Sequence, residues 1–388
     1  MNGKHLPPAC ARSRTGAAVR AQTRQRSVRW LVALLATAAV AFALAHGSAH
    51  AQPAARALIL PATAAESARY SITPHAPQAG VVRQKPVRVD AGALDDSHGA
   101  AATELQVELF DGQSVTITRD RLERRGPSDF TWLGKVRGHP NGFALLTVVD
   151  GRVSGMIEPG GVGRGARARY QILSSGDGSA LLQEIDAAAF PDDHPGGGEA
   201  VAPDASGQSA DLATASSTDG TTVQADGTST IDVMIVYSNQ TAVAAGSAIG
   251  AQAQQAIDTA NLVYANSGIT TRLRLVYAGP ANYDESGDFS TDLNRLTGTS
   301  DGYMDGVHAL RGQYGADLVS LFIENGQYCG MGWIGPSAAY AFSVVNRGCA
   351  SGNYSFPHEL GHNFGARHDT YVDAATTPYA YGHGWVDV

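Results

Sequence analysis

The stretch that decides the fold of this chain is PHELGHNFGARHD, residues 357–369. His358 and His362 are four residues apart, so on an α-helix they lie one turn apart on the same face. Both imidazoles can then reach one metal ion at about 2.0–2.1 Å. Pro357 suits the first turn of such a helix, where its missing N–H costs nothing. Gly365 is expected to end the helix, because it can adopt the left-handed conformation that turns the chain back.

The turn at Gly365 would bring His368 to the same ion as a third ligand. Three neutral histidines leave one of the four positions around zinc open for water, which is typical of a catalytic site. Zinc lowers the pKa of that water to about 7 and polarises a carbonyl group. Glu359 is rotated around the helix from the first ligand and is placed to act as general base. We therefore predict Zn2+ bound by His358, His362 and His368, with Glu359 catalytic in the hydrolysis of a peptide bond.

Other polar residues receive smaller roles. His308 and His383 are left out as ligands, because lone histidines are more often surface or packing residues. Asp369 is expected to orient the turn of the third ligand, and the alternative is a hydrogen bond to a metal-binding histidine. No role is assigned to Met331.

The segment from His358 to Asp369 resembles the extended zinc signature of the metzincin metallopeptidases, and its trailing Asp resembles the reprolysin (adamalysin-like) branch. Three further segments are similar to bacterial peptidyl-Asp metalloendopeptidases: YGADLV at 314–319, FSVVNR at 342–347 and YAYGHG at 379–384. The resemblance spans residues 230–388. It implies the same three ligands and the same base, and cleavage on the N-terminal side of Asp.

Metzincins share a tight turn that contains Met beneath the zinc, downstream of the third histidine. Met331 is the last methionine of this sequence, and none lies between His368 and Val388. We therefore expect a catalytic domain that is C-terminally truncated before this turn. The same observation gives the alternative function, a secreted metal-binding module that is catalytically weak or inactive because the Met-turn region is missing.

The N-terminus predicts export. Residues 1–29 contain many Arg and no acidic residue, and the apolar run 30–44 ends near a small-residue triplet at 49–51. This pattern predicts a signal peptide over residues 1–51 and a secreted protein, extracellular or periplasmic in transit. The alternative is a membrane anchor, but about fifteen apolar residues fall short of the ~20 that span a bilayer. We expect no membrane contact after the signal is removed.

The cysteine content agrees with a secreted protein, and the charge bears on its partners. After Cys10 is lost with the signal, Cys329 and Cys349 remain and are expected to form a disulfide; two unrelated buried thiols are the alternative. Residues 226–388 contain fifteen acidic residues, six Arg and no Lys, within a net charge of -8 for the whole chain. This balance argues against nucleic acid as a partner.

The chain outside the metal motif divides by composition. Strand-favouring segments from Glu104 to about Ile185, with an Asp150-Gly151 hairpin signal, indicate a β-rich domain. Residues 52–100 are expected to form a loosely ordered lead-in. We assign four parts: signal peptide 1–51, β-rich propeptide 52–190, flexible linker 191–230 without aromatic residues, and catalytic domain 231–388.

The catalytic part alternates between strand and helix. Strands are expected at 231–237, 272–277 and 316–323, a long Ala-rich helix runs to residue 265, and 293–314 has helical spacing. This α/β pattern predicts a metzincin-like three-layer catalytic domain with a mainly parallel sheet and an active-site helix. Residues 338–345 are expected to add a strand, at an edge of the sheet.

The partners predicted for this protein are protein or peptide substrates and its own propeptide, as inhibitor. No Cys lies between residues 52 and 328, so a propeptide thiolate cannot block the zinc. The cluster Asp192, Asp193 and His194 is the candidate instead, with a solvated turn as the alternative.

Cleavage before Asp requires a cation in the substrate pocket. Arg347 and Arg367 are nearest the motif; one could pair with the substrate carboxylate, or both could form structural ion pairs. The linker beyond residue 200 contains four Asp residues at which the enzyme could release its own propeptide: Asp204, Asp211, Asp219 and Asp226.

Overall fold

The computed structural model describes residues 55–72, 80–95, 102–160, 168–174, 179–193, 201–203 and 229–385. The predicted signal peptide, His194 and the four Asp residues proposed as cleavage sites lie outside these ranges, so their interpretation stays a prediction. No helix within the described ranges is long and apolar enough to cross a membrane.

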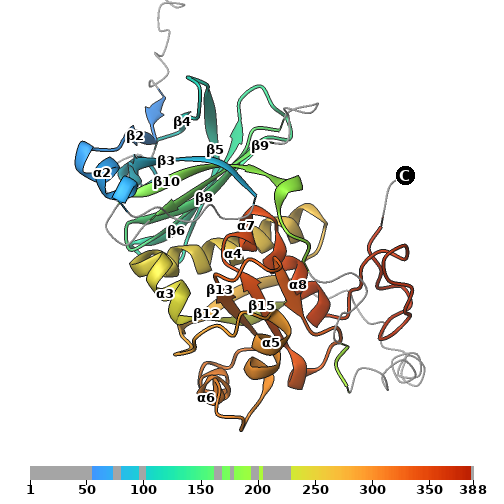
Figure 1. The fold of residues 1–388 in the computed structure, drawn as a ribbon. Coiled ribbons are helices and arrows are strands. Elements are labelled where there is room, and N and C mark those ends of the chain that lie inside the picture. The colour runs from blue at the N-terminus through green and yellow to red at the C-terminus, as the bar shows by residue number, and fades with distance from the viewer. Residues whose placement is uncertain are drawn as a thin grey trace, which may run out of the picture. The chain divides into compact units, whose positions relative to one another are not determined.

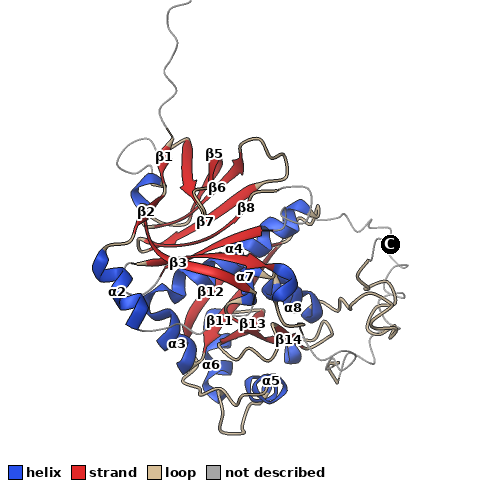
Figure 2. Cartoon of the chain, turned by 45° about the horizontal axis from the view of Figure 1, so that its top comes forward, coloured by secondary structure: helices blue, strands red, loops and turns tan. Residues whose placement is uncertain are grey.

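The first half of the described chain forms a ten-stranded sheet. Its elements are β1 Arg56–Ala57, β2 Ile59–Pro61, α2 Ala64–Ile72, β3 Val81–Val89, η1 Ala91–Ala93, β4 Glu104–Glu108, β5 Ser114–Arg124, β6 Asp129–Val136, β7 Phe143–Val149, β8 Arg152–Glu158, β9 Ala168–Ser174, β10 Ala180–Asp186 and η2 Ala187–Ala189. The strand order is β1-β4-β5-β6-β7-β8-β9-β10-β3-β2. Figure 2 shows the curvature of this sheet.

The two ends of this strand order meet at one residue. Leu58 separates β1, which pairs with β4, from β2, which pairs with β3. Its N–H donates to the carbonyl of Gln106, and its own carbonyl accepts from the N–H of Asp90. The sheet is therefore barrel-like, with few unpaired strand edges.

The N-terminal prediction is right about the hairpin and wrong about the lead-in. Asp150 and Gly151, with φ of 48° and 75°, join β7 to β8 in the left-handed conformation that a two-residue hairpin turn needs. The described residues of the expected lead-in, 55–72 and 80–95, are not loosely ordered, because β3 pairs with both β2 and β10. Neighbouring strands supply the burial that the composition of this segment did not suggest.

The second half forms a five-stranded sheet flanked by helices. Its elements are β11 Thr230–Tyr237, α3 Asn239–Ala245, η4 Gly246–Ala248, α4 Ile249–Asn266, β12 Arg272–Pro280, α5 Phe289–Thr297, α6 Asp305–Tyr314, β13 Leu318–Ile323, β14 Gly330–Gly332, η5 Ala338–Tyr340, β15 Phe342–Asn346, α7 Cys349–Gly352 and α8 Ser355–Asn363. The order is β12-β11-β13-β15-β14. Four strands are parallel and β14 is antiparallel, so the predicted mainly parallel sheet is confirmed.

The prediction that the last strand lies at the edge is wrong. β15 pairs with β13 on one side and with β14 on the other. β14 has three residues, two of them Gly, and such a short segment has no periodicity that a sequence pattern could detect.

Helices cover both faces of this sheet (Figure 1). Val233 and Ile235 of β11 join the hydrophobic cluster beneath α4 and α8. Met234 and Val236, which point to the opposite face, join the cluster beneath α5 and α6. This follows the two-residue period of a strand, and burial on both faces is what a parallel sheet requires.

Helix α4 also packs against β7 and β8 of the first sheet. On that side lies buried Asp258, whose carboxylate accepts hydrogen bonds from Arg125 (3.1 Å), Thr147 (2.7 Å), Gln254 (3.0 Å) and Thr131. Burial raises the pKa of Asp258, while Arg125 and the neutral donors oppose the rise. A buried polar cluster thus joins α4 to the N-terminal strands.

Candidate active site

The metal motif forms helix α8 and the turn after it. The N–H of Gly365 donates to the carbonyl of His362 at 2.8 Å, and the N–H of Ala366 donates to that of Gly361 at 2.9 Å. Gly365 has a φ of 90°. These are the hydrogen bonds of a helix end capped by a left-handed glycine, so the predicted end of the helix is confirmed.

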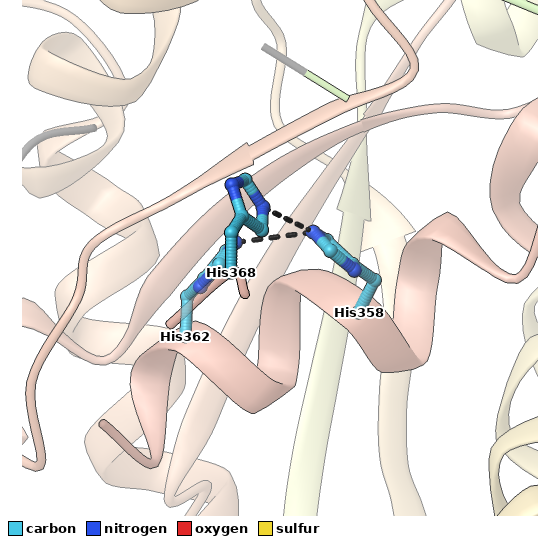
Figure 3. Close-up of side chains that lie close together, drawn as sticks. All are labelled: His358, His362 and His368. Carbon is cyan, nitrogen blue, oxygen red and sulfur yellow. Dashed lines mark hydrogen bonds between the residues drawn. The ribbon is translucent and has the colours of Figure 1, made fainter. Parts of the chain in front are cut away.

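The turn brings three imidazoles together (Figure 3). The Nε2 atom of His358 lies 3.0 Å from that of His368 and 3.1 Å from that of His362. Ligands of one tetrahedral zinc at about 2.1 Å are about 3.4 Å apart, close to this spacing. The Nδ1–H of His362 donates to the Ala366 carbonyl at 2.9 Å, which leaves its Nε2 lone pair for a metal. This donor set fits a metal ion, and it is the cluster of metal-binding side chains found in the described ranges.

The third histidine is held in place by the C-terminal segment. The N–H of Arg367 donates to the carbonyl of Gly382 at 2.6 Å, and the N–H of Gly384 donates to that of Arg367 at 3.0 Å. The Nδ1–H of His383 donates to the His368 carbonyl at 2.8 Å. His383 is therefore a support for His368 and lies outside the cluster.

His308 and Asp369 also have other contacts. The Nε2–H of His308 donates to the Gly298 carbonyl at 2.8 Å, so this side chain lies away from the cluster as expected. The Asp369 carboxylate accepts from the N–H of Tyr371 at 2.9 Å. Asp369 thus holds the turn after the third histidine, which is the structural role expected for it.

Glu359 is fully buried against the edge strand β14. A Cβ atom built on Gly330 would lie 2.6 Å from its Cγ and 2.7 Å from its Cδ, and one built on Gly332 would lie 3.2 Å from its Oε2. The absence of side chains at these two positions makes the space that the carboxylate fills. Sequence reasoning missed this pair of glycines, although their spacing puts them on one face of a strand.

Residues at the start of the predicted linker contact the same site. The Oγ–H of Ser355 donates to Oδ1 of Asp193 at 2.6 Å, and Oδ2 of Asp193 lies 4.0 Å from Nε2 of His358. The N–H groups of Cys329 and Gly330 donate to the carbonyls of Asp192 and Asp193 at 3.0 and 3.3 Å. Two members of the predicted Asp192–His194 cluster therefore lie beside α8 and β14.

The beginning of α8 is held by the first sheet. Tyr354, the residue before the helix, donates its O–H to Oε1 of Glu158 at 2.5 Å. Arg169 pairs with Glu158 at 2.8 Å and lies 4.7 Å above the Tyr354 ring. Burial, followed by the nearby Glu158 carboxylate, raises the pKa of Tyr354. Strands β8 and β9 thus support the helix that carries two of the three histidines.

Both arginines nearest the motif are engaged in internal ion pairs. Arg347 forms a two-point pair with Glu324 at 2.6 and 2.8 Å, and Arg367 pairs with Asp373. Their side chains are 7% and 3% exposed. The structure therefore agrees with the structural-ion-pair alternative for Arg347 and Arg367.

The predicted disulfide is confirmed. Cys329 and Cys349 are bonded with their Cα atoms 5.4 Å apart. The bond ties the residue before β14 to helix α7, which leads into α8. It therefore connects the start of edge strand β14 to the segment that leads into the helix with the metal motif.

Comparison with known proteins assigns the family. A family model described as "Metallo-peptidase family M12" matches residues 227–384. The peptidyl-Asp metalloendopeptidase of Xanthomonas campestris is 33% identical over 312 residues, 77% of this chain and 71% of that protein. That of Stenotrophomonas maltophilia K279a is 34% identical over 314 residues, 77% of this chain and 70% of that protein. The chain is a metallopeptidase of family M12.

The M12 match contains the histidine cluster, Glu359 and β14, and it confirms the reprolysin-like resemblance predicted from the sequence. The longer alignments extend into the N-terminal residues of this M12 metallopeptidase. Metalloproteinase-II of Bacteroides fragilis aligns with a TM-score of 0.40 and 11% identity over 69% of this chain and 81% of that chain, a likeness too low to carry an argument.

Proposed function

We propose that this M12 metallopeptidase is the precursor of a secreted zinc endopeptidase with a metzincin-like three-layer catalytic domain, and that it cleaves peptide bonds before Asp. The observation that carries the proposal is the convergence of three Nε2 atoms at 3.0 and 3.1 Å, two of them from the helix that also contains buried Glu359. A site with three histidines leaves zinc an open position, as hydrolysis requires.

In this proposal His358, His362 and His368 hold the zinc, which supplies Lewis acidity and acidifies a water when it is bound. Glu359 accepts the proton of the attacking water at a carboxylate oxygen and returns it to the leaving amine. Gly330 and Gly332 keep that carboxylate in one position. Edge strand β14 offers backbone groups to which an extended substrate can add as a strand.

Specificity for Asp is supported by the names of the two relatives, peptidyl-Asp metalloendopeptidases. Because Arg347 and Arg367 are occupied by Glu324 and Asp373, we expect neither to bind the substrate carboxylate. Peptides that differ only by Asp or Asn after the cleaved bond test this specificity, and equal kcat/KM for the two would contradict it.

We also propose that residues 1–51 are a signal peptide, 52–190 a propeptide, 191–230 a cleavable linker and 231–388 the catalytic domain. The basic and apolar N-terminus, the disulfide and the Asp residues of the linker support this division. N-terminal sequencing of the processed protein tests it. New termini at linker Asp residues, absent from Glu359→Ala, are expected for self-cleavage; the same termini in that variant would contradict it.

Metal analysis and a peptide assay test the core of the proposal. We expect about one zinc per chain, greatly reduced binding after His358→Ala, His362→Ala or His368→Ala, and retained zinc with lost activity in Glu359→Ala. The alternative, an inactive metal-binding module, predicts full zinc content without hydrolysis of casein or Asp peptides in the parent. If His368→Ala binds as much zinc as the parent, His368 is not the third ligand.

A further inference from the structure

The side chain of Asn363, the last residue of α8, is bonded to the segment that follows edge strand β14. Its Nδ2 donates to the carbonyl of Trp333 at 2.9 Å and to that of Phe342 at 3.1 Å, and the residue is 2% exposed. We infer that Asn363 is a positioning residue for the proposed hydrolysis, because its amide fixes the edge strand, and a peptide added to that strand, relative to the metal ligands. The inference rests on the proposed function and deepens it.

The bonded end of α8 is the end that carries the second metal ligand. Asn363 directly follows His362, whose carbonyl accepts from the N–H of Gly335 at 3.0 Å. Asn363 is also four residues after Glu359, so the two side chains lie one turn apart on the same face of the helix. Glu359 fills the space at Gly330, and Asn363 bonds to the residue after the strand, so both lie against β14. The amide thus sets the register between the general base and the edge strand.

Asn363 holds this strand from its inner side. The N–H of Trp333 donates to the Phe342 carbonyl at 3.3 Å, so the backbone groups of Trp333 point toward β15. Neighbouring residues of a strand point their backbone groups in opposite directions, so those of Ile334 point outward. The Ile334 carbonyl accordingly accepts from Ala202, which belongs to neither strand. Asn363 therefore fixes the strand without occupying the outward groups to which an extended substrate would bond.

The orientation of the Asn363 amide is determined by its donors. Its Oδ1 atom is buried and accepts from no residue that the structure describes. The opposite orientation would set this oxygen against the carbonyl oxygens of Trp333 and Phe342, where no hydrogen bond can form. Removal of the amide would leave the Trp333 carbonyl without this donor and the segment after β14 able to shift.

A purely structural tie is the other role that fits these bonds. Asn261 of α4 is a matched example, because its Nδ2 donates to the Leu273 carbonyl at 2.9 Å and its Oδ1 accepts from the Leu273 N–H at 2.7 Å. This tie lies at β12, the opposite edge of the sheet from β14. Loss of either tie should lower stability, but only the tie at β14 should change the rate of hydrolysis per active site.

The test compares Asn363→Ala and Asn363→Ser with Asn261→Ala in zinc-loaded enzyme made from the full-length chain. Tagged parent enzyme processes every variant and is then removed, and Glu359→Ala treated in the same way measures any parent that remains. The kcat per bound zinc and the KM are measured for a peptide with a single Asp. The Kd of acetohydroxamate, a small metal-binding probe, reports on the metal site without the edge strand, and circular dichroism reports on folding.

We expect kcat to fall about 100-fold in Asn363→Ala, as for a misplacement of about 1 Å. KM and the Kd of acetohydroxamate should stay within about threefold of the parent, because the lost contact acts in the transition state and not in binding. Asn363→Ser keeps one donor and should lose less, while Asn261→Ala should melt below the parent and keep its kcat. Parental kcat in folded Asn363 variants, with or without a rise in KM, or failure of both to fold, would overturn the inference. If the parent itself binds no zinc or cleaves no peptide, the proposed function fails instead.

Discussion

A single methyl group on the edge strand should disable the general base while leaving the metal in place. Gly330→Ala puts a Cβ atom 2.6 Å from Cγ of Glu359, about 0.8 Å inside the 3.4 Å at which ordinary contact begins. Glu359 is fully buried, so either its carboxylate or β14 must move.

The expected loss follows from that displacement. A misplacement of about 1 Å in a catalytic group costs about 100-fold in rate, and loss of a general base costs about 100- to 10,000-fold. We therefore expect kcat/KM to fall about 100-fold. Overpacking of this kind also costs about 1–3 kcal/mol in the free energy of unfolding.

The assay compares peptide hydrolysis, zinc content and melting temperature in the processed enzyme. Gly326→Ala is the matched control, because a Cβ atom at that position meets nothing within 4 Å. The expected pattern is low activity with full zinc in Gly330→Ala and parental behaviour in Gly326→Ala. Parental activity in a folded Gly330→Ala would refute the placement of Glu359 against β14.

Three further predictions concern stability. Replacing both cysteines of the disulfide with Ser, in a Glu359→Ala background, should lower the free energy of unfolding by about 3 kcal/mol, because the bond spans 20 residues; a loss below about 1 kcal/mol in urea unfolding would argue against it. Arg125→Met should destabilise the precursor by about 1–3 kcal/mol by leaving Asp258 buried without its cation, a loss moderated because Arg125 is 28% exposed. Arg121→Met, at a more exposed surface ion pair, should cost little. Hydrogen bonds from Thr291 lower the pKa of Asp288 below its ordinary value of 3.8. The ionised Asp288 therefore stabilises the folded state above pH 3.8, and this contribution is lost as the pH falls through the lowered pKa. Asp288→Asn should therefore melt below the parent at pH 7 and together with it in strong acid, and a constant difference would contradict this.

The histidine cluster could be predicted from sequence because its geometry is local. The spacing of His358 and His362 is fixed by the helix, and the turn to His368 depends on one glycine, Gly365. Each step follows from backbone conformations that a short segment specifies by itself. The alternation of strand and helix gave the parallel sheet for the same reason.

The features that the sequence did not reveal depend on contacts between segments that are far apart in the chain. β3 is ordered by β2 and β10, and β14 by β15, so their own residues contain little signal. The contact of Ser355 with Asp193 joins residues 162 apart. Asp193 could be proposed only because the chain lacks a propeptide cysteine, and its partner could not be proposed at all.

Helix α4 presents water-compatible side chains where it meets the N-terminal strands. Gln252, Gln255, Asp258 and Thr259 are buried in this structure, although residues of these types are mostly exposed to solvent in proteins. If the N-terminal domain is cleaved away, this face of α4 becomes exposed and its polar side chains can be hydrated. A large apolar surface in the same place would favour aggregation. The polar face of α4 is thus suited to a partner that can be removed, because it can take up water once it is uncovered.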